Sequence, residues 1–264
     1  MSDLDLLREA ALEAGALALD YRRKGVKVWS KDGGSPVTDA DLAVDALLKQ
    51  RLTAARPDYG WLSEETADGP ERLGRETIFV VDPIDGTAAF KDDKPWWSVA
   101  VAVVRQGQPT AAVIHGPALD ETFEAAAGGG ARLNRKPIRA SEADSLEDAD
   151  VLADAALFEP SRWPEPWPAM RFGKRNSIAY RMALVAAGAF DAAIALSPKW
   201  DWDVAAGALI VAEAGGRISD HLGRPYLFNQ PVPRQPSLVC AAPGLHPLIL
   251  NRCAPITLPE PSAP

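Results

Sequence analysis

Two aspartates, Asp82 and Asp85, stand three residues apart in a segment that reads DPIDGT. They follow Thr77–Val81, an uncharged run of β-branched and aromatic residues that is typical of a buried strand. Pro83 fixes its own φ angle and Gly86 permits a tight turn, so both carboxylates can face one point where the strand ends. Such carboxylates bind hard cations such as Mg²⁺ together with a substrate phosphate. An ordinary Asp-Gly turn would produce the same short pattern.

Acidic residues also stand at the ends of two other apolar segments. Glu64 and Glu65 follow the strand-like run Tyr59–Leu62, and Asp203 opens a helix-like run over Ala205–Ala214. Singly, each has an ordinary explanation, because Asp203 could cap its helix and the glutamates could lie in a solvated loop. Carboxylates that gather without cations repel one another. All three placements together therefore indicate a shared cation site.

Four segments, in this order along the chain, resemble the motifs of the inositol monophosphatase superfamily. These segments are SPVTDAD at 35–41, SEET at 63–66, DPIDGT at 82–87 and WDVAAGALIVAEAGG at 202–216. The superfamily comprises metal-dependent, lithium-sensitive phosphomonoesterases and includes the 3′(2′),5′-bisphosphate nucleotidases. The resemblance implies a phosphoric monoester hydrolase that millimolar lithium inhibits, and it leaves the substrate open.

The resemblance also implies two or three Mg²⁺ ions. Carried over position by position, Glu64, Asp82 and the main-chain carbonyl of Ile84 hold the first ion. Asp82 bridges to a second ion, which also binds Asp85 and Asp203, and a third, weaker ion lies beside Glu64. Two ions about 4 Å apart can activate a water molecule and stabilise the leaving oxygen. Glu64 counts among the catalytic residues, and Asp203 among those that bind substrate.

Asp41 and Thr87 are the expected water-activating pair. Asp41 also lies three residues after Thr38, so its alternative role is the acidic half of a helix capping box. The main-chain amides of Gly86 and Thr87 are expected to hold a phosphate oxygen. Lys31 lies in the loop before the helix that begins near Thr38. It is expected either to neutralise a metal-site carboxylate or to be an ordinary surface lysine.

Two positions bear on the substrate. In inositol monophosphatases an acidic residue that contacts inositol hydroxyls lies seven positions before the last metal-binding Asp, and here that position is Leu196. A site that reads hydroxyls depends on its polar partners, so this loss weakens polyol recognition. Arg181 stands where bisphosphate nucleotidases tend to have a lysine that meets the second phosphate, and Arg pairs well with phosphate. A helix-surface arginine would look the same.

These positions favour a 3′(2′),5′-bisphosphate nucleotidase that converts adenosine 3′,5′-bisphosphate to AMP. Inositol monophosphatase is the nearest alternative, and fructose-1,6-bisphosphatase activity also needs a second phosphate site. A family member that binds a phosphorylated ligand without catalysis is a further alternative. It is disfavoured because every expected metal-binding carboxylate is present.

The composition is typical of a soluble enzyme and is compatible with a small anionic substrate. The chain has 264 residues, 47% of them hydrophobic, and a formal net charge of −8. This charge argues against a nucleic-acid polymer or an anionic membrane as partner. A small phosphorylated metabolite remains compatible because metal ions supply positive charge, and a homodimer is possible. The start of the chain lacks the features of a signal peptide, and its apolar stretches are too short for a bilayer, so we expect a cytoplasmic location.

The cysteines and histidines point to no further chemistry. Two cysteines, Cys240 and Cys253, do not make a disulfide scaffold, and reduced thiols are expected. The three histidines, His115, His221 and His246, do not stand at metal-ligand spacing. No nucleophile-elbow motif supports a Ser/His/Asp hydrolase.

Hydrophobic periodicity predicts a mixed α/β protein with an N-terminal α+β part (1–140) and a C-terminal α/β part (141–264) that form one catalytic unit. The resemblance implies a layered α-β-α-β-α sandwich. The Pro- and Trp-rich segment 158–167 is predicted to be a surface loop with aromatic anchors, with a lid as the alternative. Helices are expected at 3–23, 38–56, 175–187 and 203–214, and strands at 59–62, 77–81, 99–104, 110–114, 121–126, 190–196, 216–219 and 237–241.

Overall fold

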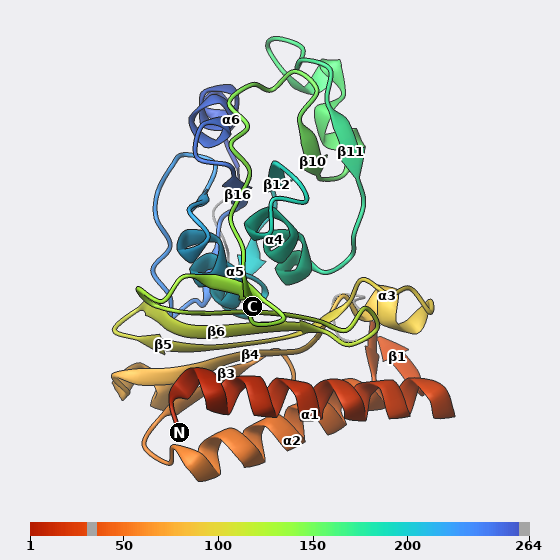
Figure 1. The fold of residues 1–264 in the computed structure, drawn as a ribbon, viewed down its shortest axis with the longest axis vertical. Coiled ribbons are helices and arrows are strands. Elements are labelled where there is room, and N and C mark those ends of the chain that lie inside the picture. Colours follow the sequence, from red (N-terminus) through yellow and green to blue (C-terminus); the bar gives the residue numbers. More distant parts are fainter. Residues whose placement is uncertain (31–35, 259–264) are drawn as a thin grey trace.

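A computed structural model describes residues 1–30 and 36–258 of the chain. Its elements form five alternating layers of helix and sheet, as Figure 1 shows. The expected mixed α/β class and α-β-α-β-α sandwich are confirmed. Among the described residues, no helix is both long enough and apolar enough to cross a membrane. The three helical layers consist of α1 (Asp3–Lys24) with α2 (Asp39–Ala55), α4 (Ile178–Ala186) with α5 (Asp201–Glu213), and α6 (Leu245–Cys253).

The larger sheet has seven strands and lies between the first two helical layers (Figure 1). Its neighbouring strands are antiparallel, except that β3 and β4 are parallel. The short helix η1 (Pro70–Gly74) connects β3 to β4. In spatial order the strands are β3 (Gly60–Ser63), β4 (Thr77–Asp85), β5 (Ser98–Arg105), β6 (Gln108–Gly116), β7 (Glu121–Ala126), β8 (Ala131–Leu133) and β9 (Lys136–Pro137).

Both faces of this sheet are buried, which explains why its central strands are continuously apolar. Phe79 and Val81 of β4 pack with the residues of α1 and α2. Ile78 and Val80 point to the opposite face, toward α4 and α5. A helical layer therefore covers each side of the sheet.

The smaller sheet has five strands, and α6 covers its outer face with Leu245 and Ile249. Its spatial order is β11 (Arg171–Gly173), β10 (Asp150–Leu152), β12 (Ala192–Ala195), β16 (Leu238–Ala241) and β14 (Arg217–Ser219). Two further pairs of strands are β1 (Val28–Ser30) with β2 (Pro36–Thr38), and β13 (Lys199–Trp200) with β15 (Arg234–Gln235). The predicted division near residue 140 falls between the last strand of the seven-stranded sheet and the first strand of the five-stranded sheet. Its status as a domain boundary stays a prediction.

The segment 158–167 has the aromatic anchors that its composition predicts. The ring of Phe158 packs against Trp163, Trp167 and Phe172, with centroids 6.5, 5.0 and 4.8 Å apart. Phe158 and Trp163 are buried in the core under the smaller sheet. Phe158 is the last residue of the short helix η2 (Ala155–Phe158), and the short helix η3 (Pro160–Arg162) lies between Phe158 and Trp163.

Several element ends differ from the sequence-based expectation. Helix α4 begins at Ile178 instead of residue 175, because Ser177 caps it by accepting a hydrogen bond from the amide of Tyr180. Helix α5 begins at Asp201, two residues earlier than expected. Helices α3 (Thr87–Lys91) and α6 were not predicted, because five to nine residues carry little periodic signal.

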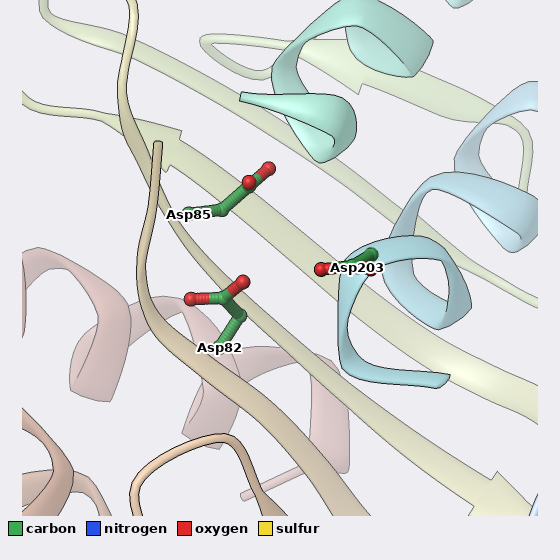
Figure 2. Close-up of side chains that lie close together, drawn as sticks. All are labelled: Asp82, Asp85 and Asp203. Carbon is green, nitrogen blue, oxygen red and sulfur yellow. The ribbon is translucent and has the colours of Figure 1, made fainter. Parts of the chain in front are cut away.

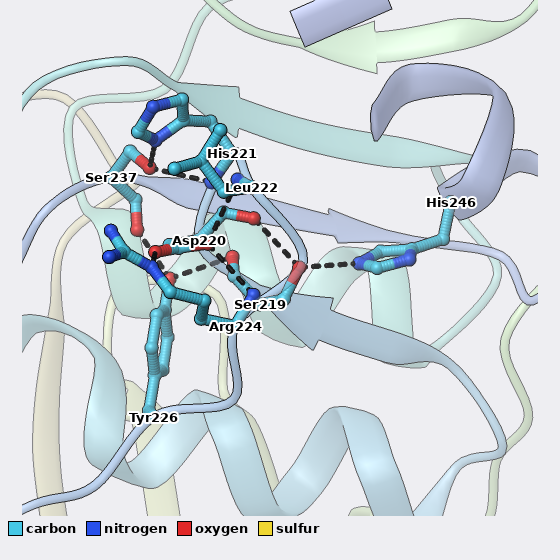
Figure 3. A network of polar contacts seen from close by, with 8 residues as sticks. All are labelled: Ser219, Asp220, His221, Leu222, Arg224, Tyr226, Ser237 and His246. Carbon is cyan, nitrogen blue, oxygen red and sulfur yellow. Dashed lines mark hydrogen bonds and ion pairs between the residues drawn. The ribbon is translucent and has the colours of Figure 1, made fainter. Parts of the chain in front are cut away.

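Two histidines belong to a polar network beside the smaller sheet (Figure 3). His221 Nδ1 lies 2.9 Å from Ser237 Oγ, and His246 Nε2 lies 3.0 Å from Ser219 Oγ; all four residues are buried. Asp220 instead accepts hydrogen bonds from the loop that follows it. Within the described chain, neither histidine is hydrogen-bonded to a carboxylate that would orient it as a base. The network therefore holds loops together. The thiols of Cys240 and Cys253 are both free and buried, as expected.

Candidate metal centre

Three carboxylates meet between β4 and α5. Asp82 and Asp85 extend from β4, and Asp203 extends from the first turn of α5, as Figure 2 shows. One carboxylate oxygen from each lies within 4.8 Å of the other two. Asp203 is more than a hundred positions away from Asp82 and Asp85 in sequence, so the packing of α5 on the larger sheet brings it to them.

An irregularity in β4 turns Asp82 and Asp85 to the same side. In a regular strand, residues three apart point to opposite faces. Here Asp82 pairs with Ala100 and Asp85 pairs with Ser98, so β4 advances three residues while β5 advances two. The extra residue is a β-bulge, and Pro83, which has no N–H to donate to the ladder, lies inside it. The expectation that the strand ends before Asp82 is therefore wrong, because the strand continues through Asp85.

Gly86 ends this strand in a conformation that favours glycine. Its φ angle is +91°, and a Cβ atom there would lie 3.0 Å from the main-chain nitrogen of Ser177. The close approach brings the beginning of α4 against the DPIDGT turn. Helix α3 begins at Thr87, immediately after this glycine.

Asp85 is held by the beginning of α4. Its Oδ2 accepts hydrogen bonds from Ser177 Oγ at 2.5 Å and from the amide of Ala179 at 2.6 Å. Ser177 Oγ in turn lies 3.1 Å from Ser98 Oγ on β5. Burial raises the pKa of Asp85 to about 6, although these hydrogen bonds favour its charged form. Oδ2 of Asp85 is thus held by hydrogen bonds from α4 and its cap, and the carboxylate remains part of the acidic cluster.

Asp203 is the third residue of α5, and it is not the N-cap that the sequence allows. Its Oδ2 accepts a hydrogen bond from the amide of Trp200 at 2.8 Å, as the acidic residue of a capping box does. Burial, together with the charges of Asp85 and Glu64, raises the pKa of Asp203 to about 8. The close packing of these carboxylates therefore disfavours the state in which all of them are ionised.

Asp82 gives the clearest sign that the cluster suits a cation. It is 1% exposed, and its Oδ1 is buried yet accepts no hydrogen bond from any residue that the structure describes. Burial, followed by the charges of Glu64 and Asp85, raises the pKa of Asp82 well above its usual range. A buried oxygen of this kind calls for a partner. An all-oxygen donor set of carboxylates fits a hard divalent cation such as Mg²⁺.

Glu64 follows β3 and faces the same cluster. Its main-chain amide donates to the carbonyl of Val81, the residue before Asp82. The negative charge of Glu64 contributes to the raised pKa values of Asp82, Asp203 and two further aspartates. The carbonyl oxygen of Ile84 lies 3.2 Å from Thr87 Oγ1, and it is one of two acceptors within reach of that hydroxyl proton. The metal-binding roles of Glu64 and Ile84 stay predictions, and Lys31 lies outside the described residues.

Asp41 completes a capping box and also contacts Thr87, while its role in activating water stays a prediction. Its Oδ2 accepts from the amide of Thr38 at 2.8 Å and from Thr38 Oγ1 at 2.5 Å, which completes a capping box at the start of α2. Its Oδ1 lies 3.2 Å from Thr87 Oγ1. Chiefly because it is buried, Asp41 has a raised pKa. The helix cap therefore occupies one oxygen and leaves the other to Thr87.

A cavity of about 500 Å³ contains the predicted residue Arg181. Leu196 lines the same cavity, together with the cationic side chains of Arg162 and Lys199 and the carboxylate of Asp154. The charges of Asp85 and Asp203 act on Arg181 and Lys199 respectively, opposing the lowering of their pKa values by burial. Ile178, which stands between the two residues that bind Asp85, also lines this cavity, so the cavity adjoins the carboxylate cluster.

Sequence reasoning missed Lys199 and Arg162 as cavity residues. Lys199 stands only three positions after Leu196, and its Nζ donates to Ser197 Oγ at 2.7 Å. A lysine in the stretch before the last motif was a usable signal. Arg162 had none, because the loop that contains it reaches the cavity only through the tertiary fold. Arg181 is anchored by its Nε, which donates to the carbonyl of Arg175 at 2.6 Å.

Comparison with known proteins identifies the family. A model of the inositol monophosphatase family matches residues 2–256. The chain belongs to the inositol monophosphatase family. It is similar to a histidinol-phosphatase of Chlorobaculum parvum, at 36% identity over 86% of this chain and 89% of that protein. It is also similar to the 3′(2′),5′-bisphosphate nucleotidase CysQ of Aggregatibacter actinomycetemcomitans, at 32% identity over 84% and 86% of the two chains.

A solved member of the inositol monophosphatase family, the IMPase of Thermotoga maritima, has the same fold. It superposes with a TM-score of 0.82, at 27% sequence identity, over 97% of this chain and 98% of that chain. Membership of the inositol monophosphatase family makes this chain a phosphoric monoester hydrolase, and enzymes of this family are metal-dependent. The acidic cluster is the place where the chain could bind that metal.

The raised pKa values predict how pH and Mg²⁺ act on stability. Asp85 and Asp203 have pKa values of about 6 and about 8 in the folded protein, above the value of about 4 for an unfolded aspartate. The folded state thus holds more protons over this range, and metal-free protein should lose stability as the pH rises from about 4 to about 8. Mg²⁺ should raise the Tm more at pH 8 than at pH 5. Scanning calorimetry with EDTA or Mg²⁺ measures both effects, and equal Mg²⁺ shifts at the two pH values would contradict the prediction.

Proposed function

We propose that the protein is a Mg²⁺-dependent phosphomonoesterase for a substrate that has a second anionic group, namely a 3′(2′),5′-bisphosphate nucleotide such as adenosine 3′,5′-bisphosphate. The supporting observation is the charge of the cavity beside the carboxylate cluster. Arg162, Arg181 and Lys199 line it against one carboxylate, Asp154. Leu196 lies where an acceptor for polyol hydroxyls would be expected. Such a cavity favours an anion over a neutral polyol.

Glu64, Asp82, Asp85, Asp203 and the carbonyl of Ile84 would hold the ions. Bound there, Mg²⁺ would neutralise the phosphate and supply Lewis acidity toward it and toward water. The remaining work belongs to the protein's own residues. They orient the phosphate beside a nucleophilic water and stabilise the charge that shifts during phosphoryl transfer.

Asp41 and Thr87 would orient the attacking water. If Thr87 Oγ1 donates its proton to Asp41 Oδ1, its lone pairs point outward and can accept a hydrogen bond from water. Asp41 would then act as a general base toward this water, with the Thr87 hydroxyl relaying the proton. The amides of Gly86 and Thr87, at the start of α3, would bind a phosphate oxygen.

The similar proteins suggest one other candidate substrate with support in the cavity. The relative from Chlorobaculum parvum is named a histidinol-phosphatase, and Asp154 is a carboxylate that could meet a cationic amine. Inositol 1-phosphate and fructose 1,6-bisphosphate complete the set of substrates to compare. A family member that only binds a phosphorylated ligand would turn over none of them.

Arg181→Ala tests the assignment. If Arg181 meets the second phosphate, this change should raise KM for adenosine 3′,5′-bisphosphate by one to two powers of ten, since a charged hydrogen bond contributes about 1.5–3 kcal/mol. The KM for inositol 1-phosphate and kcat on either substrate should change little. Initial rates with Mg²⁺ measure both, and Arg217→Ala, at an exposed residue of β14, is the matched control.

Equal losses on both substrates would mean that Arg181 supports the fold or the metal centre. Faster turnover of histidinol phosphate than of the bisphosphate nucleotide would assign the cavity to a cationic substrate. We also propose inhibition by millimolar lithium, which the same assay tests. The cytoplasmic location and the homodimer stay predictions.

A further inference from the structure

The carboxylate of Asp45 lies one helical turn beyond Asp41 on α2, and the proposed chemistry does not use it. Asp45 is 7% exposed. Its Oδ1 accepts a hydrogen bond from Ser63 Oγ at 2.5 Å, and its Oδ2 accepts one from Thr66 Oγ1 at 2.7 Å. Ser63 and Thr66 stand on either side of the Glu64-Glu65 pair. One buried carboxylate therefore binds both ends of the segment that contains Glu64.

The same two hydroxyls are bound to the surrounding loop. Ser63 Oγ also accepts from the amide of Glu65 at 3.4 Å. Thr66 Oγ1 also accepts from Trp61 Nε1 at 3.3 Å. Both hydroxyl protons are thus directed to Asp45, while their lone pairs hold the segment itself. A hydroxyl that donates to a carboxylate makes a shorter and stronger bond than one between neutral groups.

We propose that Asp45 is a positioning residue that holds Glu64 toward Asp82. This inference rests on the proposed function, which assigns Glu64 as a metal ligand. The amide of Glu64 is bound to the carbonyl of Val81 of β4, and that contact fixes the main chain at Glu64 itself. The Asp45 bonds fix the residues on both sides and limit the positions that the Glu64 side chain can reach. Helix α2 therefore contributes to the centre twice, through Asp41 and through Asp45.

Asp45→Ala and the double variant Ser63→Ala/Thr66→Val remove the two sides of this contact. Outer residues that orient metal ligands typically change metal affinity or activity by 10- to 100-fold. Both variants should therefore weaken Mg²⁺ binding about 10- to 100-fold by isothermal titration calorimetry with Mg²⁺ alone. Combining them should add little further loss, because both remove the same contact. Thr53→Val is the matched control, since Thr53 Oγ1 donates only within α2, to the carbonyl of Lys49 at 2.7 Å.

Hydrogen exchange of metal-free protein gives a readout that does not depend on the metal. The amides of residues 64–66 should exchange faster in Asp45→Ala than in the unchanged protein or in Thr53→Val. If Asp45→Ala does not fold, Thr66→Val, which removes one of the two bonds, should still show faster exchange and weaker Mg²⁺ binding. A variant that melts earlier but keeps its Mg²⁺ affinity and its exchange at 64–66 would overturn the inference and leave Asp45 a purely structural residue.

The two measurements also separate this inference from the proposed function. An unchanged protein that binds no Mg²⁺ in the calorimeter would refute the metal centre. The exchange rates would still decide whether Asp45 holds the segment. Normal Mg²⁺ binding in all variants would refute the positioning role alone.

Discussion

Asp82→Asn is expected to lower kcat by about three powers of ten or more. Asp82 is the residue expected to bind both ions, and metal ions supply several kcal/mol of transition-state stabilisation in such sites. Each 1.36 kcal/mol corresponds to a tenfold change in rate. Asparagine keeps the shape of the side chain and has one oxygen, but it lacks the charge that would hold the ions. Steady-state rates on a phosphomonoester with saturating Mg²⁺ measure the loss.

The fold of Asp82→Asn should be at least as stable as that of the unchanged protein when no metal is present. Asp82 is buried beside the charges of Glu64, Asp85 and Asp203, and a neutral side chain relieves their repulsion. Its Tm in EDTA should therefore be equal or higher, and Mg²⁺ should raise it less. Asp58→Asn, at an exposed residue outside the cluster, is the control. A mutant with unchanged kcat would refute the role of Asp82.

Thr87→Val should lower kcat by about two to four powers of ten, the usual contribution of general acid–base groups. Valine has the shape of threonine but no hydroxyl, so the link between Asp41 Oδ1 and the attacking water would be lost. The capping box of α2 uses the other oxygen of Asp41 and should survive. The variant should therefore keep its helix content and its Mg²⁺ affinity.

Thr87→Ser is the matched control, because it keeps a hydroxyl at the same position. It should retain most of the activity, while Thr87→Val should not. If both substitutions lower kcat equally, the methyl group or the packing of α3 matters, and the hydroxyl has no catalytic role. If neither lowers kcat, water is oriented by other groups.

The strands of the larger sheet, the first helix and the capping box could be predicted from the sequence because their signals are local. The runs Thr77–Val81 and Val99–Val104 are apolar on both faces, and only a sheet covered on both sides buries them. The first helix was predicted over 3–23 and is observed over Asp3–Lys24. The Thr38–Asp41 capping box was predicted as one of two roles for Asp41, and it is present. These features depend on neighbours a few residues away.

Features that depend on contacts between distant segments were not predicted or were predicted wrongly. Strand β4 continues past Val81 to Asp85 because β5 pairs with it as far as Asp85, a contact that no local pattern reveals. The bulge that turns both aspartates to one side has the same origin. The start of α4 at Ile178 follows from the cap by Ser177, which is itself bound to Asp85.

By itself, the sequence determined which residue types are present for the chemistry: oxygen ligands at the ends of apolar segments, in the order of the inositol monophosphatase family. Only the tertiary structure decided how they act together. It packs α5 on the larger sheet so that Asp203 reaches Asp82, and it places Arg162, Arg181 and Lys199 around one cavity. It also brings Asp45 to the hydroxyls on either side of Glu64. The physical reason is that side-chain direction, burial and charge interaction depend on segments far apart in the chain, whereas a motif records only its own spacing.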